Sequence, residues 1–171
     1  MVALLKVLNI HERRFAAPAS AVGSLIDTLA STADRLWPHR SWPRMTFDRP
    51  LGVGAKGGHG PIRYVVESHE PGVSVRFRFT GPAGFDGHHG FEMLGSGGRE
   101  VVLRHTLQME TKGPAVISWP LIYRPLHDAL LEDAMAQAAV SLGVEPEVRG
   151  WSRWVKLLRS LLAGKRTARR P

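Results

Sequence analysis

The chain has 171 residues, 43% of them hydrophobic, which fits one globular domain with its own core. Because it has no cysteine, disulfides, thiolate catalysis and thiolate metal sites are excluded. The net charge of +8 lies in the tail: eight of the 23 Lys and Arg residues follow from Arg149 onward, and the other 15 balance the 15 Asp and Glu residues. A neutral body with a basic tail argues against a broad nucleic-acid surface.

The first predicted element is a strand over residues 4–15, ended by the sequence Ala-Ala-Pro. The N-terminus lacks the basic region and the cleavage site of a secretion signal, so we expect a cytoplasmic protein. Hydrophobic residues at helical spacing then predict two short helices over residues 19–36, with Ser31, Thr32 and Asp34 marking the break between them.

Two hairpins follow. Alternating residues from 62 to 79 predict a hairpin in which Tyr64 pairs with Phe77. The second hairpin joins residues 85–94 and 100–111 around a turn at 95–99. Placing Met93 opposite Val101 puts His89 opposite His105, both on the buried face.

The longest predicted helix covers residues 118–142, a stretch rich in Leu, Ala, Met, Glu and Gln that Gly143 ends. Its predicted inner stripe is Ile122, Leu126, Leu130, Asp133 and Gln137, and its predicted solvent stripe is Arg124, Asp128 and Glu132. Tyr123 and His127 either rim a cavity or lie on the surface. The order of elements predicts an α+β fold with the helices on one face of an antiparallel sheet.

Short motifs occur within these elements: FAAPA at residues 15–19, LGVG at 51–54, HGFE at 89–92 and LRH at 103–105, followed by the terminal helix. In these motifs and in the order of elements, the chain resembles the SRPBCC or START-like superfamily, which includes bacterial polyketide cyclases. The resemblance implies the helix-grip fold: a curved antiparallel sheet wrapped around a long C-terminal helix, with two short helices after the first strand and an apolar cavity between sheet and long helix. We assign residues 1–146 to this domain and residues 147–171 to a basic amphipathic tail helix.

The resemblance implies binding, or transport, of a hydrophobic small molecule such as a lipid or polyketide. The residues predicted to bind it are Tyr64, Phe77, His89, Phe91, Leu103, His105, Leu107, Ile122, Leu126 and Leu130. The alternative is an enzyme of the polyketide cyclase or dehydratase type, in which inward-facing histidines transfer protons. A third alternative is an interaction protein with a filled core.

The candidate catalytic residues are His89, His105 and Asp133. Asp133 either faces His105 in the cavity or lies at the edge of the apolar stripe. No HExxH or comparable spacing occurs, so we expect no metal ion. The GxGxxG match at residues 52–57 leads into a strand rather than a helix, so we expect no cofactor and place His59 on a surface loop.

Residues 150–163 predict a second amphipathic helix, with Trp and Leu on one arc and basic residues on the other. It either lies on an anionic membrane, making the protein peripheral at the inner face, or packs on the body or on a second subunit in a homodimer. The predicted membrane contacts are Trp151, Trp154, Leu158, Lys156 and Arg159. We expect no specific nucleic acid, and the Arg, Gly and Pro usage suggests a bacterial source.

Overall fold

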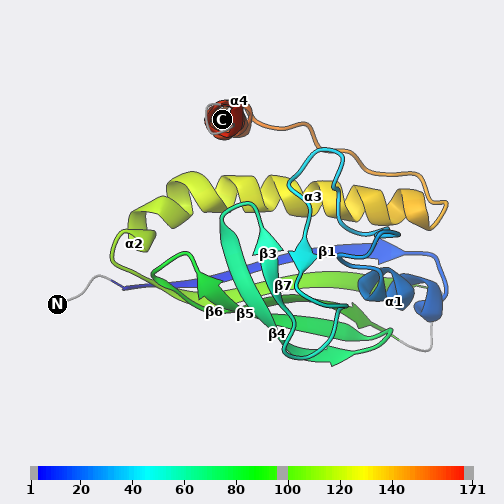
Figure 1. Cartoon of the computed structure of the whole chain (residues 1–171). Helices are drawn as coiled ribbons and strands as arrows, with labels where there is room; N and C mark the ends of the chain where they lie inside the picture. Colours follow the sequence, from blue (N-terminus) through cyan, green and yellow to red (C-terminus); the bar gives the residue numbers. More distant parts are fainter. Residues whose placement is uncertain (1–3, 96–99, 168–171) are drawn as a thin grey trace.

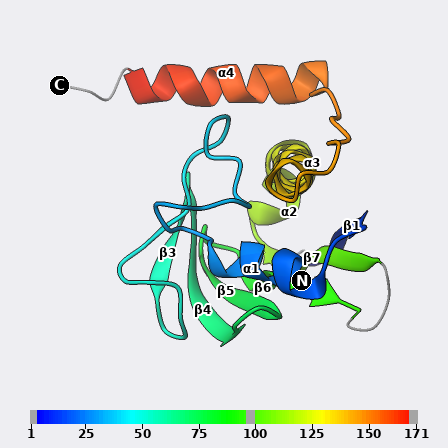
Figure 2. The ribbon, with the colours of Figure 1, turned by 90° about the vertical axis from the view of Figure 1, so that its right-hand side faces the viewer.

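A computed structural model describes residues 4–95 and 100–167. Seven antiparallel strands form one curved sheet in the order β1-β7-β6-β5-β4-β3-β2 (Figure 1). The strands are β1 (Leu4–Phe15), β2 (Thr46–Phe47), β3 (Lys56–His59), β4 (Ile62–Glu70), β5 (Ser74–Gly81), β6 (Phe85–Leu94) and β7 (Val101–Lys112). The helices are α1 (Ala19–Asp27), α2 (Ala115–Ser118), the π-helical turn η1 (Trp119–Tyr123), α3 (Arg124–Ser141) and α4 (Arg153–Thr167). The sheet curves around α3, which confirms the predicted α+β helix-grip architecture (Figure 2).

Two short helices were predicted after the first strand, and the prediction of the second one is wrong. Only α1 forms, and residues 28–45, all of which the structure describes, are turns and bends. The Asp34 carboxylate accepts hydrogen bonds from the backbone N–H groups of Ala30 (2.8 Å), Leu36 (3.0 Å) and Trp37 (2.8 Å). A short acidic side chain that bonds nearby backbone in this way stabilises a turn in place of a helix.

The first hairpin keeps the predicted inner face but not the predicted register. Tyr64 pairs with Phe79 rather than with Phe77, and a bulge interrupts the pairing between Val66 and Ser68. Because strand side chains alternate with a period of two, a slip of two residues leaves every side chain on its expected face.

The second hairpin shows the same kind of slip. Met93 pairs with Leu103 instead of Val101. Residues 96–99 of the predicted turn lie outside the described residues, and β6 and β7 on either side of it form as expected. The predicted side chains therefore face α3, although the cross-strand residue pairs differ from the predicted ones.

The long helix is a continuous run of α2, η1 and α3 from Ala115 to Ser141, so its prediction is confirmed. Its predicted inner stripe is displaced by about one position. Trp119 is buried and Tyr123 packs against Phe85 at a ring separation of 5.1 Å, whereas Ile122 is 38% exposed. Because residues 122 and 123 are both apolar, the helical periodicity did not distinguish an inner stripe that contains Ile122 from one that contains Tyr123. The π-helical turn also changes the direction in which the following side chains point.

The predicted solvent stripe of the long helix is wrong at Asp128 and Glu132. Both side chains face β1, where they contact His11, and Asp128 also accepts a hydrogen bond from Asn9. Arg124, by contrast, is exposed as predicted.

Two close approaches fix the helices on the sheet. A Cβ atom at Gly23 would lie 1.9 Å from the carbonyl oxygen of Gly72, so only glycine lets α1 pack this closely on the turn between β4 and β5. In α3, the side chains of Ala134 and Ala138 are fully buried. The alanine-rich end of α3 therefore lies close to the body, as expected from its small side chains.

The tail helix packs on the body of the same chain and crosses α3 (Figures 1 and 2). Val155 and Leu158 are buried, and the guanidinium of Arg159 lies 4.2 Å from the ring centre of Trp42 and 3.9 Å from that of Trp151. Within the described part of the chain, no helix is both long enough and apolar enough to cross a membrane.

A proline in α3 provides a further anchor for the tail. Pro125 has no N–H group, so the carbonyl of Leu121, four residues earlier, lacks its usual helical donor. The Nε1–H of Trp154 donates to this carbonyl at 2.8 Å. A break in the backbone bonding of the long helix thus becomes an attachment point for α4.

Candidate functional site

Two buried histidines meet at the centre of the inner face. His89 on β6 is 5% exposed and His105 on β7 is 2% exposed, and the Nδ1 atom of His89 lies 3.3 Å from the Nε2 atom of His105. The inward orientation of both is confirmed, although His105 pairs with Phe91 along the strands and His89 with Leu107. The contact is diagonal rather than directly across the strand pair.

Each of these imidazoles has a second nitrogen that is buried without a partner. Within the described residues, His89 Nε2 and His105 Nδ1 make no hydrogen bond. Their neighbours are aromatic: His89 lies against Tyr64 at a ring separation of 4.8 Å and against Phe79 at 4.8 Å. The pair therefore offers two unused polar atoms inside an apolar environment.

Further histidines extend this pair in both directions. The Nδ1 atom of His59 lies 3.1 Å from the hydroxyl of Tyr64, whose ring in turn contacts His89. On the other side, the ring centre of His105 lies 5.1 Å from that of His127 on α3. His59 belongs to β3 and is half-buried, so its predicted place on a surface loop is wrong.

Burial keeps these groups neutral. Loss of hydration, which penalises the imidazolium form, lowers the pKa of His89 and His105 well below 6.5 and that of His59 to about 3. The same cause raises the pKa of the Tyr64 hydroxyl well above 10. Near pH 7, each of the three imidazoles thus has one N–H donor and one acceptor nitrogen.

The predicted ligand-binding residues mostly share the inner face. Buried side chains are those of Tyr64, Phe77, His89, Phe91, Leu103, His105, Leu107 and Leu130. Leu126 is half-buried, and Ile122 is displaced toward solvent by the phase of the helix. His127, for which the sequence left two positions open, lies on the inner side beside His105.

Asp133 does not face His105. Its Oδ2 atom accepts hydrogen bonds from the indole N–H groups of Trp42 at 2.7 Å and Trp151 at 2.9 Å. Of the two alternatives left open by the sequence, the edge of the stripe is therefore correct. The carboxylate joins the loop before β2 to the tail, and no contact in the described residues connects it with the histidine pair.

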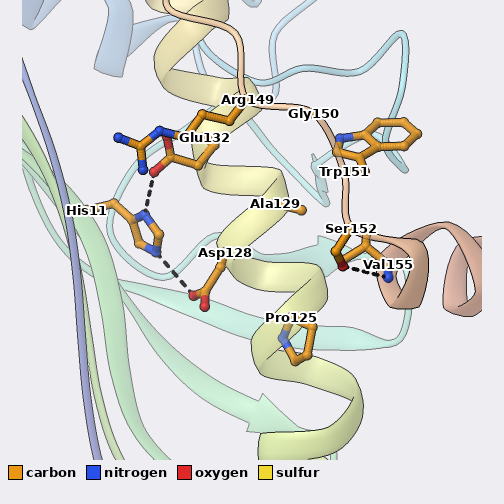
Figure 3. Close-up of a pocket in the computed structure, with 10 residues that line it drawn as sticks. All are labelled: His11, Pro125, Asp128, Ala129, Glu132, Arg149, Gly150, Trp151, Ser152 and Val155. Carbon is orange, nitrogen blue, oxygen red and sulfur yellow. Dashed lines mark hydrogen bonds and ion pairs between the residues drawn. The ribbon is translucent and has the colours of Figure 1, made fainter.

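A second polar cluster lies between β1, α3 and the segment before α4, beside a cleft of about 360 Å³ (Figure 3). Its centre is His11, whose Nε2 atom lies 3.2 Å from Asp128 Oδ1 and whose Nδ1 atom lies 3.2 Å from Glu132 Oε1. Burial alone would lower the pKa of His11, but the hydrogen bonds to these two carboxylates outweigh it and raise the pKa. The cluster is not apparent from the sequence, because His11 and the two carboxylates are more than 100 residues apart.

No family model matches the sequence, and no curated protein is similar to it. The structure is similar to several solved structures. CalU16 from Micromonospora echinospora is 15% identical with a TM-score of 0.54, over 98% of this chain and 96% of that chain. Truncated norcoclaurine synthase from Thalictrum flavum is 17% identical with a TM-score of 0.60, over 83% and 97%. XoxI from Bacillus cereus is 11% identical with a TM-score of 0.57, over 80% and 95%.

The chain is a helix-grip protein. It shares this fold with CalU16 and norcoclaurine synthase, which confirms the resemblance to SRPBCC or START-like proteins at the level of the fold. At such low identities the likeness establishes the fold alone. The fold does not determine the function, which depends on the side chains of the site.

Proposed function

We propose that this protein binds a largely apolar small molecule between the sheet and the long helix, with His89 and His105 as its hydrogen-bonding partners. The observation that carries the proposal is the pair of buried, unpartnered nitrogens, His89 Nε2 and His105 Nδ1. A buried polar atom without a partner costs roughly 1–3 kcal/mol, which a bound polar group recovers. Apolar walls with a few polar atoms are typical of small-molecule sites.

The aromatic residues around the pair favour a ligand with rings. Phe79 is nearly parallel to the His89 ring, with an interplanar angle of 25°. Phe85 contacts both Trp119 and Tyr123, which lie in η1 above β6. Norcoclaurine synthase has been solved in complex with dopamine and hydroxybenzaldehyde, so a protein of this fold binds small aromatic molecules. A polyketide or another lipid-like molecule with a polar group fits the same chemistry here.

The alternative function is proton transfer of the cyclase or dehydratase type. Two neutral imidazoles in contact at 3.3 Å place a donor and an acceptor nitrogen side by side, which suits general acid–base catalysis. The two functions differ in turnover: a binding protein returns its ligand unchanged, and an enzyme releases a cyclised or dehydrated product.

Native mass spectrometry of the full chain isolated from its own host is expected to show a bound small molecule. The double variant His89→Leu/His105→Leu is expected to lose it, because both polar partners are removed. The matched control is His88→Ala, which changes the adjacent residue on the opposite face of β6 and is expected to retain the molecule. Wild-type protein without a bound molecule, and with unchanged imidazole ¹⁵N resonances on addition of apolar host extract, would contradict the proposal.

We also propose that the exposed side of α4 associates with an anionic membrane surface. Trp151, Leu158 and Arg159, three of the five predicted contacts, pack on the body instead. Trp154, Leu157 and Leu161 remain 47%, 49% and 58% exposed, next to basic residues of the same helix. Exposed Trp and Leu beside Lys and Arg are typical of helices that bind the interface of anionic bilayers.

Flotation with vesicles containing anionic lipid tests the tail. Wild-type protein is expected to bind and to be released by salt, and Leu157→Ser/Leu161→Ser is expected to reduce the bound fraction severalfold. Val148→Ser is the matched control, because Val148 is 72% exposed but lies outside α4. Equal binding of wild type and double variant would refute membrane contact through this face. A change of oligomeric state in the double variant would instead assign the face to a homodimer.

A further inference from the structure

A group of potential metal ligands lies outside the proposed ligand site. His11 on β1 and His127 and Asp128 on α3 each contribute one potential ligand atom, and these three atoms lie within 4.8 Å of one another. We propose that His11, His127 and Asp128 form a binding site for a divalent transition metal ion. The proposal is independent of the function proposed above, because none of the three residues carries that function.

The distances suit coordination after small side-chain movements. Asp128 Oδ1 lies 3.2 Å from His11 Nε2 and 3.6 Å from His127 Nδ1. Ligand atoms at ~2.0–2.2 Å from one ion, in tetrahedral or octahedral geometry, are about 3.0–3.5 Å apart. The donor set of two imidazoles and one carboxylate is typical of Zn²⁺ and Fe²⁺ sites.

A second carboxylate orients the first histidine. Glu132 Oε1 lies 3.2 Å from His11 Nδ1, and Arg13 holds the other oxygen of Glu132 at 3.0 Å. Histidines that bind metal ions commonly donate their other N–H group to a carboxylate in this way. The carboxylate of Asp128 only accepts, so its 3.2 Å contact with His11 Nε2 needs a proton on Nε2; a metal ion would replace that proton while Nδ1–H stays with Glu132.

The strongest indication comes from His127. Within the described residues, neither of its ring nitrogens has a hydrogen-bond partner, although both are buried and only 15% of the side chain is exposed. The separation of 3.6 Å from Asp128 is too long for a hydrogen bond.

The residues around the three ligands leave room for further ligands of the ion. Asn9 Nδ2 donates to Asp128 Oδ1 at 2.9 Å, and the buried Oδ1 atom of Asn9 has no partner within the described residues. His11, Asp128 and Glu132 also line the cleft of about 360 Å³ (Figure 3). Two of the three proposed ligands, His11 and Asp128, thus border an open cleft, which suits a site that keeps a coordination position for water or substrate.

Titration of the chelator-treated full chain with Co²⁺ and Zn²⁺ tests the site. Wild-type protein is expected to bind one equivalent, with Co²⁺ giving visible absorption bands in the d–d region. His127→Gln and the isosteric Asp128→Asn are expected to bind at least tenfold more weakly, and Glu132→Gln about tenfold more weakly through loss of the outer carboxylate. Circular dichroism establishes that each variant is folded.

His88→Ala provides the matched control, since it removes a histidine from the opposite face of β6 and leaves the three ligands intact. It is expected to bind Co²⁺ and Zn²⁺ as the wild type does. The proposal is overturned if wild-type protein binds neither ion stoichiometrically, or if His127→Gln and Asp128→Asn bind them as tightly as wild type.

Discussion

Acidification from pH 7 to pH 4 is expected to unfold this protein. His59, His89 and His105 are neutral in the folded state because burial lowers the pKa of each imidazole. In the unfolded chain they take up protons near pH 6.5. Below that pH the unfolded state binds more protons than the folded state, so the free energy of unfolding falls as the pH falls.

The effect is large because the three residues act together. Each histidine lowers the free energy of unfolding by about 1.4 kcal/mol per pH unit between pH 6.5 and its own folded-state pKa. For His59 this interval extends down to about pH 3. Three such groups give roughly 4 kcal/mol per unit, against a typical total stability of about 5–15 kcal/mol. His11 acts in the opposite direction, because its raised pKa stabilises the folded state in acid and that contribution is lost as the pH rises through its folded-state value.

Urea unfolding followed by circular dichroism between pH 8 and pH 4 measures this dependence. The double variant His89→Leu/His105→Leu is expected to lose a large part of the acid slope, and His59 and His127, whose pKa values burial also lowers, keep the rest. His88→Ala is expected to keep most of it. A free energy of unfolding that stays constant from pH 7 to pH 4 would show that the inner histidines are already charged or hydrated.

The same double variant is expected to be more stable than wild type at pH 8. Leucine removes the two unpartnered nitrogens and fills the space with apolar groups, so the free energy of unfolding is expected to rise by about 1–3 kcal/mol. The loss of the contact between His89 and His105 does not reverse this, because replacing both partners of a buried pair by apolar groups is neutral or stabilising. Stability gained at the expense of binding is typical of substitutions in a functional site.

The single variants His89→Leu and His105→Leu distinguish removal of the unpartnered nitrogens from a general change in core packing. His89→Leu leaves His105 without its remaining partner, so it is expected to be less stable than the double variant, and His105→Leu is expected to behave in the same way. Urea unfolding at pH 8 gives all three values, and the double-mutant cycle gives the coupling between the two sites. A double variant less stable than either single variant would show that the histidine nitrogens are satisfied in solution.

Alternation along the strands was sufficient to predict that His89 and His105 face inward. It was not sufficient to predict their pairing, because a slip of two residues preserves every face and the turn lengths do not reveal it. The long helix was predictable from composition. Its phase was not, because apolar residues at 122 and 123 fit two stripes equally and the π-helical turn, which contains Pro120 and is followed by Pro125, shifts the stripe.

Contacts between residues that are far apart in the sequence could not be predicted. The carboxylate of Asp133 interrupts an apolar stripe, but nothing in the helix itself indicates that Trp42 and Trp151 donate to it. The sequence around His11 indicates only that it lies in a strand. The packing of β1 against α3 brings its side chain to Asp128. Position along a helix or strand gives the direction of a side chain, whereas its partner depends on the tertiary structure.

The bond between Trp154 and the Leu121 carbonyl links two parts of the molecule that were proposed to have separate tasks. Leu121 belongs to η1, which lies over the aromatic end of the interior, and Trp154 belongs to the exposed face of the tail. If η1 moves outward to admit a molecule, either this hydrogen bond breaks or α4 moves with it. If the proposed ligand enters in this way, its binding and the position of the tail are energetically coupled, and by reciprocity a surface that draws Trp154 away changes the affinity for that ligand.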